Sequence, residues 1–133
     1  METRPRILIV EDDQSWQGVY RDLLKALDYF GLVVGTKHEA LLEVEKDNFD
    51  AFVIDIRLDS DDVGNKDGLT ILRRLSERSE AGRAILYSAN VTAGYREEIE
   101  QLGAFTVLEK NDPFPFRLLI DSLKTAVAQG GRT

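Results

Sequence analysis

Short apolar runs without polar interruption alternate with helical patterns along this chain, and this alternation limits the fold more than any other feature. The clearest runs are residues 7–10, 51–54 and 84–87. Apolar runs of this length without polar alternation are typical of strands covered on both faces, as in a parallel sheet. Weaker runs at residues 32–34 and 104–108 bring the number of predicted strands to five.

Helical patterns follow each of these runs. The first stripe consists of Trp16, Val19, Tyr20, Leu23, Leu24 and Leu27. Thr36 and Glu39 have the spacing of a capping box before a predicted helix at 40–46. A third helix is predicted from the stripe Leu69, Ile71, Leu72 and Leu75, and a fourth from the polar-rich segment 92–102. The last helix carries the stripe Phe116, Leu119, Ile120, Leu123 and Val127. Asp112 is its predicted N-cap, and Pro113 is at its first position.

Five strands alternating with five helices predict an α/β fold with right-handed crossovers and helices on both faces of a parallel sheet. At this size we expect a flavodoxin-like doubly wound (βα)5 sandwich with strand order 2-1-3-4-5. One domain is expected over residues 1–129. The glycine-containing segment 130–133 is expected to be a flexible tail or the start of a linker.

Composition narrows the chemistry. The 133 residues include no cysteine, which excludes disulfides, thiolate zinc sites and a cysteine nucleophile. The first apolar run has four residues and is followed by three acids, so we expect a cytoplasmic protein that neither is secreted nor spans a membrane. The formal net charge of −7 argues against nonspecific binding to nucleic acid or anionic membrane. It is compatible with a Mg²⁺ site, and equally with a role in solubility alone.

Polar residues follow four of the predicted strands directly. Glu11, Asp12 and Asp13 follow the first, Asp55 the third, Ser88 the fourth and Lys110 the fifth. Because these strands are neighbours in the predicted order, their ends should meet at one edge of the sheet. Clustered carboxylates hold Mg²⁺, a carboxylate serves as a nucleophile, and hydroxyl and ammonium donors neutralise a transferred phosphoryl group.

Each of these residues also has a simpler interpretation. Asp12 or Asp13 fits an N-cap of the first helix, Asp55 an Asx turn and Ser88 the cap of the following helix. Lys110 alone is most often a solvated side chain. The combination of all four positions favours a phosphoryl-transfer site.

These motifs identify a family resemblance. The sequence resembles the receiver domains of bacterial response regulators (CheY-like proteins of two-component phosphorelays) over about residues 6–129. The stretches that carry it are ILIVEDD at 7–13, VIDI at 53–56, DGL at 67–69, LYSA at 86–89, GA at 103–104 and LEK at 108–110.

The resemblance implies that Asp55 accepts a phosphoryl group from a phosphohistidine on a partner histidine kinase or phosphotransfer protein. Asp12, the Asp55 carboxylate and the backbone carbonyl of Arg57 would ligate Mg²⁺, and Glu11 would assist through water. Ser88 and Lys110 would bond the phosphoryl group. Such a protein catalyses only its own phosphorylation and dephosphorylation.

The resemblance also bears on partners. A downstream protein would meet the face formed by the fourth helix, fifth strand and fifth helix. Direct nucleic-acid or membrane binding is not expected, and a homodimer is left open.

The sequence departs from the family pattern at three places. Residues 59–66 are an acidic insertion, interpreted as a tolerated surface loop or as a modifier of metal affinity or kinase choice. Asn111 replaces the usual proline after the lysine, so a trans Lys110–Asn111 bond is predicted. Val107 stands where receivers usually carry an aromatic residue that relays the signal. These departures support an alternative function, a degenerate receiver that acts as a phosphorylation-independent interaction module.

Other residues carry less information. His38, the single histidine, is predicted to face solvent, away from the site. Trp16 is interpreted mainly as packing, with a place at the edge of the site as the alternative. Arg57 and Asn90 each lie two residues after a site residue, where the resemblance implies an influence on phosphoryl lifetime whose direction the sequence does not give. A flavin-binding module of the same fold is a third class, but its phosphate would be repelled by the acidic first loop.

Overall fold

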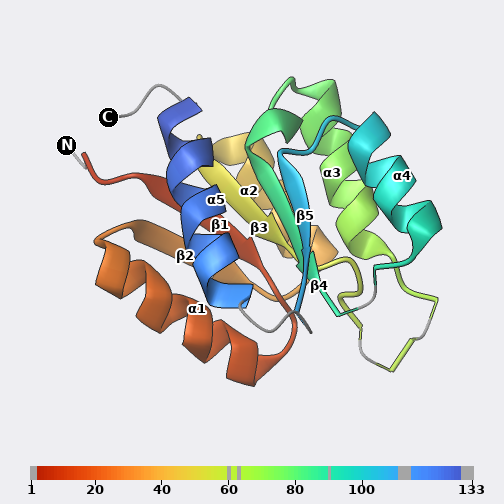
Figure 1. Ribbon diagram of the computed structural model, residues 1–133, viewed down its shortest axis with the longest axis horizontal. Coiled ribbons are helices and arrows are strands. Elements are labelled where there is room, and N and C mark those ends of the chain that lie inside the picture. The colour runs from red at the N-terminus through yellow and green to blue at the C-terminus, as the bar shows by residue number, and fades with distance from the viewer. Residues whose placement is uncertain (1–2, 60, 63, 90, 111–114, 130–133) are drawn as a thin grey trace.

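A computed structural model describes residues 3–59, 61–62, 64–89, 91–110 and 115–129. Strands and helices alternate in the order β1 (Arg6–Val10), α1 (Gln14–Leu27), β2 (Phe30–Val34), α2 (Lys37–Lys46), β3 (Ala51–Ile54), α3 (Asp67–Glu77), the short 3₁₀ helix η1 (Ala81–Arg83), β4 (Ala84–Ser88), α4 (Ala93–Gln101), β5 (Thr106–Glu109) and α5 (Pro115–Gln129). The strands form one sheet of order β2-β1-β3-β4-β5, and every neighbouring pair is parallel (Figure 1). The predicted flavodoxin-like fold and strand order are confirmed.

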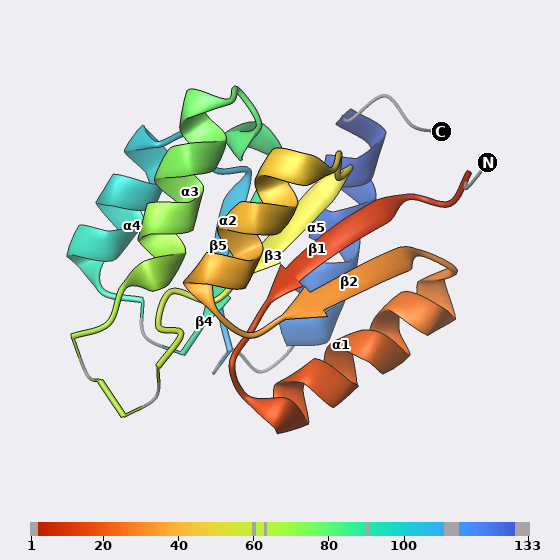
Figure 2. The same cartoon turned by 180° about the vertical axis from the view of Figure 1, so that it is seen from behind.

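Two hydrophobic clusters cover the two faces of the sheet. Alternate residues of each strand point to opposite faces, so Ile7 and Ile9 pack toward α1 and α5, while Leu8 and Val10 pack toward α2, α3 and α4. Figure 1 shows α5 in front of the sheet, and the reverse view in Figure 2 brings α2 and α3 to the front. All four residues of β3 are buried, which explains the uninterrupted apolar sequence of this strand.

Side-chain caps fix where the first two helices begin. The Asp13 carboxylate accepts a hydrogen bond from the Trp16 backbone N–H at 3.0 Å and caps α1. The Thr36 hydroxyl accepts from the Glu39 N–H at 3.1 Å and contacts the Glu39 carboxylate. The predicted cap is therefore present, and α2 begins at Lys37, three residues before the predicted start, because the apolar pattern appears only from the second turn.

Other boundaries differ from the prediction at the ends of the sheet elements. β2 begins at Phe30 instead of residue 32, and β5 covers Thr106–Glu109 instead of 104–108. Gly103 has φ of +86° and ends the turn after α4, so the chain becomes a strand two residues later than its apolar residues suggest. α5 begins at Pro115; the predicted cap at Asp112 and Pro113, the Lys110–Asn111 bond and the tail at 130–133 lie outside the described residues.

Within the described part of the chain, the helices are all too short or too polar to cross a bilayer. The expected exposure of His38, on α2, is confirmed.

Candidate functional site

Backbone pairing continues for one residue beyond three of the strands and places the polar residues at one edge of the sheet. The Glu11 N–H donates to the Val34 carbonyl at 2.9 Å, and the Asp55 N–H donates to the Val10 carbonyl at 3.0 Å. Ser88 is the last residue of β4, and its carbonyl accepts from the Lys110 N–H at 3.1 Å. The parallel register therefore holds these backbones in fixed positions before any side chain contributes.

Asp55 is the centre of the resulting site. Its carboxylate Oδ1 accepts a 2.6 Å hydrogen bond from the Ser88 hydroxyl, and its Oδ2 accepts from Lys110 Nζ at 2.9 Å. Lys110 Nζ also donates to the Glu11 carboxylate. The side chains of Lys110, Glu11 and Asp55 are 7%, 1% and 10% exposed, so these charges interact where water screens them little.

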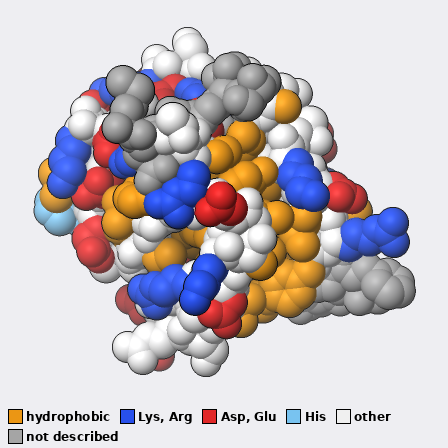
Figure 3. Space-filling model, turned by 90° about the vertical axis from the view of Figure 1, so that its left-hand side faces the viewer, with side chains coloured by type: hydrophobic (Ala, Val, Ile, Leu, Met, Phe, Trp, Pro, Cys, Tyr) orange, Lys and Arg blue, Asp and Glu red, His pale blue; other side chains and the backbone are white. Residues whose placement is uncertain are grey.

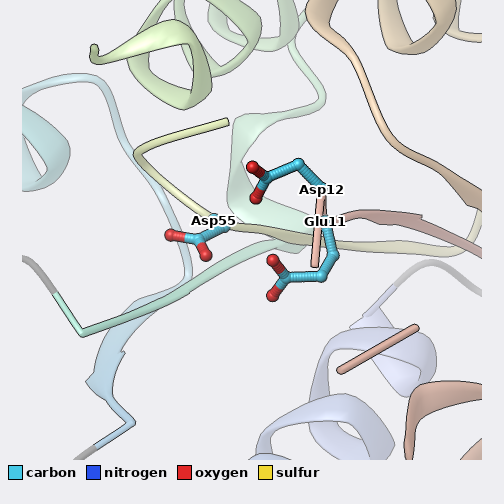
Figure 4. A group of neighbouring side chains, drawn as sticks. All are labelled: Glu11, Asp12 and Asp55. Atoms are coloured by element: carbon cyan, nitrogen blue, oxygen red, sulfur yellow. The ribbon is translucent and has the colours of Figure 1, made fainter. Parts of the chain in front are cut away.

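Three carboxylates meet at this edge. Single oxygens of Glu11, Asp12 and Asp55 all lie within 4.8 Å of one another. Figure 4 shows the three side chains extending to the same side from the residues after β1 and β3. Oxygen ligands at such spacing fit a small, hard divalent cation, and Lys110 alone cannot neutralise three carboxylates. The donor set therefore fits Mg²⁺.

The simpler interpretations of Asp12 and Ser88 do not hold in the structure. Asp13, rather than Asp12, caps α1, and Asp12 joins the carboxylate group. Thr92, rather than Ser88, caps α4 by accepting from the Tyr95 N–H at 3.1 Å. Both functional candidates are thereby available at the edge of the sheet.

Burial raises the pKa of Glu11 from 4.5 to about 7. This net pKa includes the neighbouring Asp55 charge, which also raises it, and the Lys110 ammonium and the hydrogen bonds from Lys110 and Asp13, which lower it. Near neutral pH, a carboxyl with this pKa is partly protonated in the absence of a metal ion and releases its proton when a divalent cation binds.

Gly68 brings the first turn of α3 against the backbone of Asp55. A Cβ on Gly68 would lie 2.0 Å from the Asp55 carbonyl oxygen and 2.7 Å from Ile56 Cα. The Gly68 N–H donates to the Ile56 carbonyl at 2.8 Å, which fixes this close approach. The sequence analysis used Gly68 only as part of a family motif and missed its contact with the Asp55 backbone; a glycine at the start of a predicted helix was the available signal.

The described residues of the insertion, 59, 61–62 and 64–66, form hydrogen bonds through their own side chains. Asp59 Oδ1 accepts from the Asp61 N–H, and Asp62 Oδ1 accepts from the Gly64 N–H. Asn65 Oδ1 accepts from the Leu58 and Asp67 N–H groups, each at 3.0 Å, and closes the loop. Among the described residues, the carboxylate group with metal-binding spacing contains none from this insertion. These contacts agree with the interpretation as a surface loop.

An aromatic cluster borders the site on the side of α1 and α5. The Trp16 ring centroid lies 4.6 Å from Lys110 Nζ, and the Tyr87 ring centroid lies 5.9 Å from it. Trp16 also meets Tyr87 edge-on at 5.6 Å and contacts Tyr20 and Phe116. Trp16 thus lies at the edge of the site, which sequence reasoning had ranked below simple packing.

The described residues also line a cavity of about 420 Å³ away from this edge. It lies between α1 and β2 and includes Arg21, Leu24 and Lys25. This side of the molecule shows hydrophobic side chains with basic and acidic ones around them (Figure 3). None of the converging carboxylates, nor Ser88 or Lys110, lines that cavity.

Most of the predicted site residues are brought together: Glu11, Asp12, Asp55, Ser88 and Lys110. Arg57 lies in the loop two residues after Asp55, and its carbonyl remains a predicted metal ligand. Val107 is a buried residue of β5. Asn90 lies outside the described residues.

Comparisons with known proteins agree with this geometry. Residues 7–124 match the family model of the response regulator receiver domain. The structure is similar to the receiver domain of a sensor histidine kinase from Pseudomonas aeruginosa PAO1, which was solved with a magnesium ion coordinated in the active site cleft (28% identity, TM-score 0.75, covering 94% of this chain and 98% of that one).

Two further solved structures show the same fold. One is a sensor protein from Polaromonas sp. JS666, with 31% identity, a TM-score of 0.77 and coverage of 96% of this chain and 98% of that one. The other is a CheY-like response regulator receiver domain protein from Methanospirillum hungatei JF-1, with 22% identity, a TM-score of 0.82 and coverage of 96% and 97%. Among curated proteins, none matches this sequence significantly.

Proposed function

Because this chain belongs to the family of response regulator receiver domains, the signalling modules of two-component systems, we propose that Asp55 accepts a phosphoryl group from a histidine kinase or phosphotransfer protein. The observation that carries the proposal is the pair of contacts at Asp55, where a hydroxyl and an ammonium each donate to one carboxylate oxygen. Residues 1–129 form the proposed receiver domain, and 130–133 its tail or linker.

In this proposal, the hydrogen bonds from Ser88 and Lys110 determine which donor is released when Asp55 reacts. One Asp55 oxygen attacks the phosphorus as the bond to the donor nitrogen breaks, and that oxygen gives up its present hydrogen bond. If Oδ1 attacks, Ser88 is released, and if Oδ2 attacks, Lys110 is released. The released donor is then within reach of the oxygens of the new phosphoryl group, whose charge it stabilises.

Glu11, Asp12, the Asp55 carboxylate and the Arg57 carbonyl are the proposed holders of Mg²⁺. Bound there, Mg²⁺ supplies positive charge that offsets the carboxylates and the incoming phosphoryl oxygens. The buried Glu11 supports this assignment, because burial and, to a smaller extent, the Asp55 charge raise its pKa, and a divalent cation would favour its ionised form.

The proposed output surface is the face formed by α4, β5 and α5. Arg96 on α4 pairs with Glu109 on β5 at 3.1 Å across this face, and the buried Val107 lies on the same strand. Phosphorylation at Asp55 would alter partner binding on this face through Ser88 and Lys110. Ser88 is the last residue of β4, and Lys110 directly follows β5.

The second candidate function is docking without phosphorylation. It is favoured by Val107, which cannot act as the aromatic relay usual at this position. Both candidates use the same fold, but only the first requires a reactive acceptor.

Incubation with acetyl phosphate and Mg²⁺, followed by intact-protein mass measurement, separates the two functions. We expect the wild type to gain the mass of one phosphoryl group and Asp55→Asn to gain none. Asp61→Asn is the matched control, because Asp61 is an exposed acid of the insertion, outside the carboxylate group, and this variant should be phosphorylated like the wild type. A wild type without mass gain would leave docking as the function.

A further inference from the structure

We propose that Trp16 is a positioning residue for Lys110: its indole ring holds the lysine ammonium over the acceptor carboxylate and sets how fast Asp55 is phosphorylated. This inference deepens the proposed function and rests on it. The ligand class is unchanged, but the assignment adds a residue from α1 that takes part in the site without touching the phosphoryl group.

The contact is close and enclosed. Lys110 Nζ lies 4.6 Å from the Trp16 ring centroid, within the range of cation–π attraction, while it donates to the Asp55 and Glu11 carboxylates. Only 7% of the Lys110 side chain is exposed, so the ring and the carboxylates together replace its water. Desolvation of this kind strengthens cation–π attraction.

Trp16 is itself held by contacts at the start of α1. Its backbone N–H donates to the capping Asp13 carboxylate, and the neighbouring Gln17 side-chain amide donates to the Glu11 carbonyl at 2.7 Å. The indole contacts Tyr20, Tyr87 and Phe116. The ring is therefore fixed to the same segment that supplies Glu11 and Asp12, and its position follows that of the carboxylates.

A lysine needs such a support because its ammonium is a point charge on a flexible stem. Lys110 follows β5 directly, and its carboxylate partners come from the residues after β1 and β3. The Trp16 ring blocks one side of Lys110 Nζ, so the ammonium can move only along the edge of the sheet. When a phosphoryl group forms on Asp55, Nζ has only a short path from the carboxylate to the new oxygens.

Two measurements test the assignment. The first is the rate of mass gain with acetyl phosphate and Mg²⁺ in wild type, Trp16→Leu and Trp16→Phe, each also combined with Lys110→Met. We expect Trp16→Leu to be slower by about threefold to tenfold, the order expected for loss of one cation–π contact, and Trp16→Phe to recover part of the rate. In the Lys110→Met background, Trp16→Leu should have no further effect.

The second measurement does not need phosphorylation. Trp16 is the single tryptophan of the chain, so the intrinsic tryptophan emission reports on it alone. Lys110→Met should change the emission intensity or maximum of the protein without any phosphodonor. Phe30→Leu is the matched control for the rate, because it removes an aromatic ring that lies 4.6 Å from the Arg6 guanidinium at the start of β2, away from the site; it should phosphorylate at the wild-type rate.

The outcomes distinguish this inference from the proposed function. If Trp16→Leu slows the reaction equally with and without Lys110, or has no effect, Trp16 does not act through the lysine, although Asp55 remains the acceptor. An emission unchanged by Lys110→Met would also overturn the inference. A wild type that gains no phosphoryl group would refute the proposed function, while the emission test would still decide whether the two side chains interact.

Discussion

Gly68→Ala should destabilise this protein, although alanine favours helix more than glycine does. Gly68 is in the first turn of α3, and a Cβ there would lie 2.0 Å from the Asp55 carbonyl oxygen and 2.8 Å from the Asp55 carbonyl carbon. The obstructing atoms are backbone atoms and cannot rotate away. The start of α3, or the residues after β3, must therefore move by more than about 1 Å to restore ordinary van der Waals contact.

The magnitude follows from two opposing effects. Overpacking a well-ordered site costs about 1–3 kcal/mol, and replacing glycine by alanine within a helix returns at most about 1 kcal/mol. The displacement also strains the 2.8 Å hydrogen bond from the Gly68 N–H to the Ile56 carbonyl. We therefore expect a net loss of about 2 kcal/mol in the free energy of unfolding.

Gly18→Ala is the matched control. Gly18 lies inside α1, and a Cβ there would meet no atom within 4 Å. This substitution should stabilise the protein by about 1 kcal/mol, because only the helix-propensity effect remains. The same chemical change should thus have opposite signs at two helical positions of one chain.

Urea unfolding of the wild type and both variants measures the difference, and the rate of phosphorylation by acetyl phosphate measures the effect on the site. Because the displaced backbone carries Asp55, the proposed acceptor, we expect Gly68→Ala to react about tenfold more slowly or worse. A Gly68→Ala protein with wild-type stability and rate would refute the packing argument. Destabilisation by Gly18→Ala would refute the comparison.

Two further predictions concern charge at the site. Mg²⁺ should stabilise the folded wild type by about 1.4 kcal/mol at a concentration roughly ten times its dissociation constant. Thermal unfolding measures this stabilisation, which should be smaller in Asp12→Asn and unchanged in Asp61→Asn. In metal-free buffer, the folded protein holds a proton on Glu11 that the unfolded chain releases near pH 4.5, so stability should fall as pH rises from 4.5 to about 7. The decline in the free energy of unfolding can reach about 1.4 kcal/mol per pH unit, and Glu11→Gln should flatten it. A decline of equal slope in Glu11→Gln would show that other groups cause it.

The residues that meet at the edge of the sheet could be predicted because the sequence indicates both the strand order and the polar residues at the strand ends. Asp55 and Ser88 come directly after or at the end of buried runs, and parallel pairing carries the register one residue further. Once the fold is known, the backbone register alone predicts that these residues lie close together, without any information about side-chain directions. This is why five separate residues could be assigned to one site.

Contacts that depend on side-chain direction could not be predicted in this way. Either Asp12 or Asp13 satisfied the capping pattern, and only the backbone conformation shows that Asp13 is the cap. Trp16 belongs to an apolar helical stripe, so periodicity alone gave it the same role as Leu24. Its contact with Lys110 joins residues 94 positions apart, and no local pattern records such a distance.

The arrangement around Asp55 depends on both helical layers, not on the sheet alone. From one face, α3 touches the acceptor backbone through Gly68; from the other, α1 touches the lysine through Trp16. Asp55 and Lys110 are joined by a 2.9 Å hydrogen bond, so a displacement of either layer changes the same donor–acceptor distance. Phosphorylation of Asp55, as proposed, would change that distance as well, because the ammonium would move from the carboxylate to the new phosphoryl oxygens. In the proposed function, phosphorylation of Asp55 would therefore also act on α1 and α3 through Trp16 and Gly68, and these two contacts do not depend on an aromatic side chain at position 107.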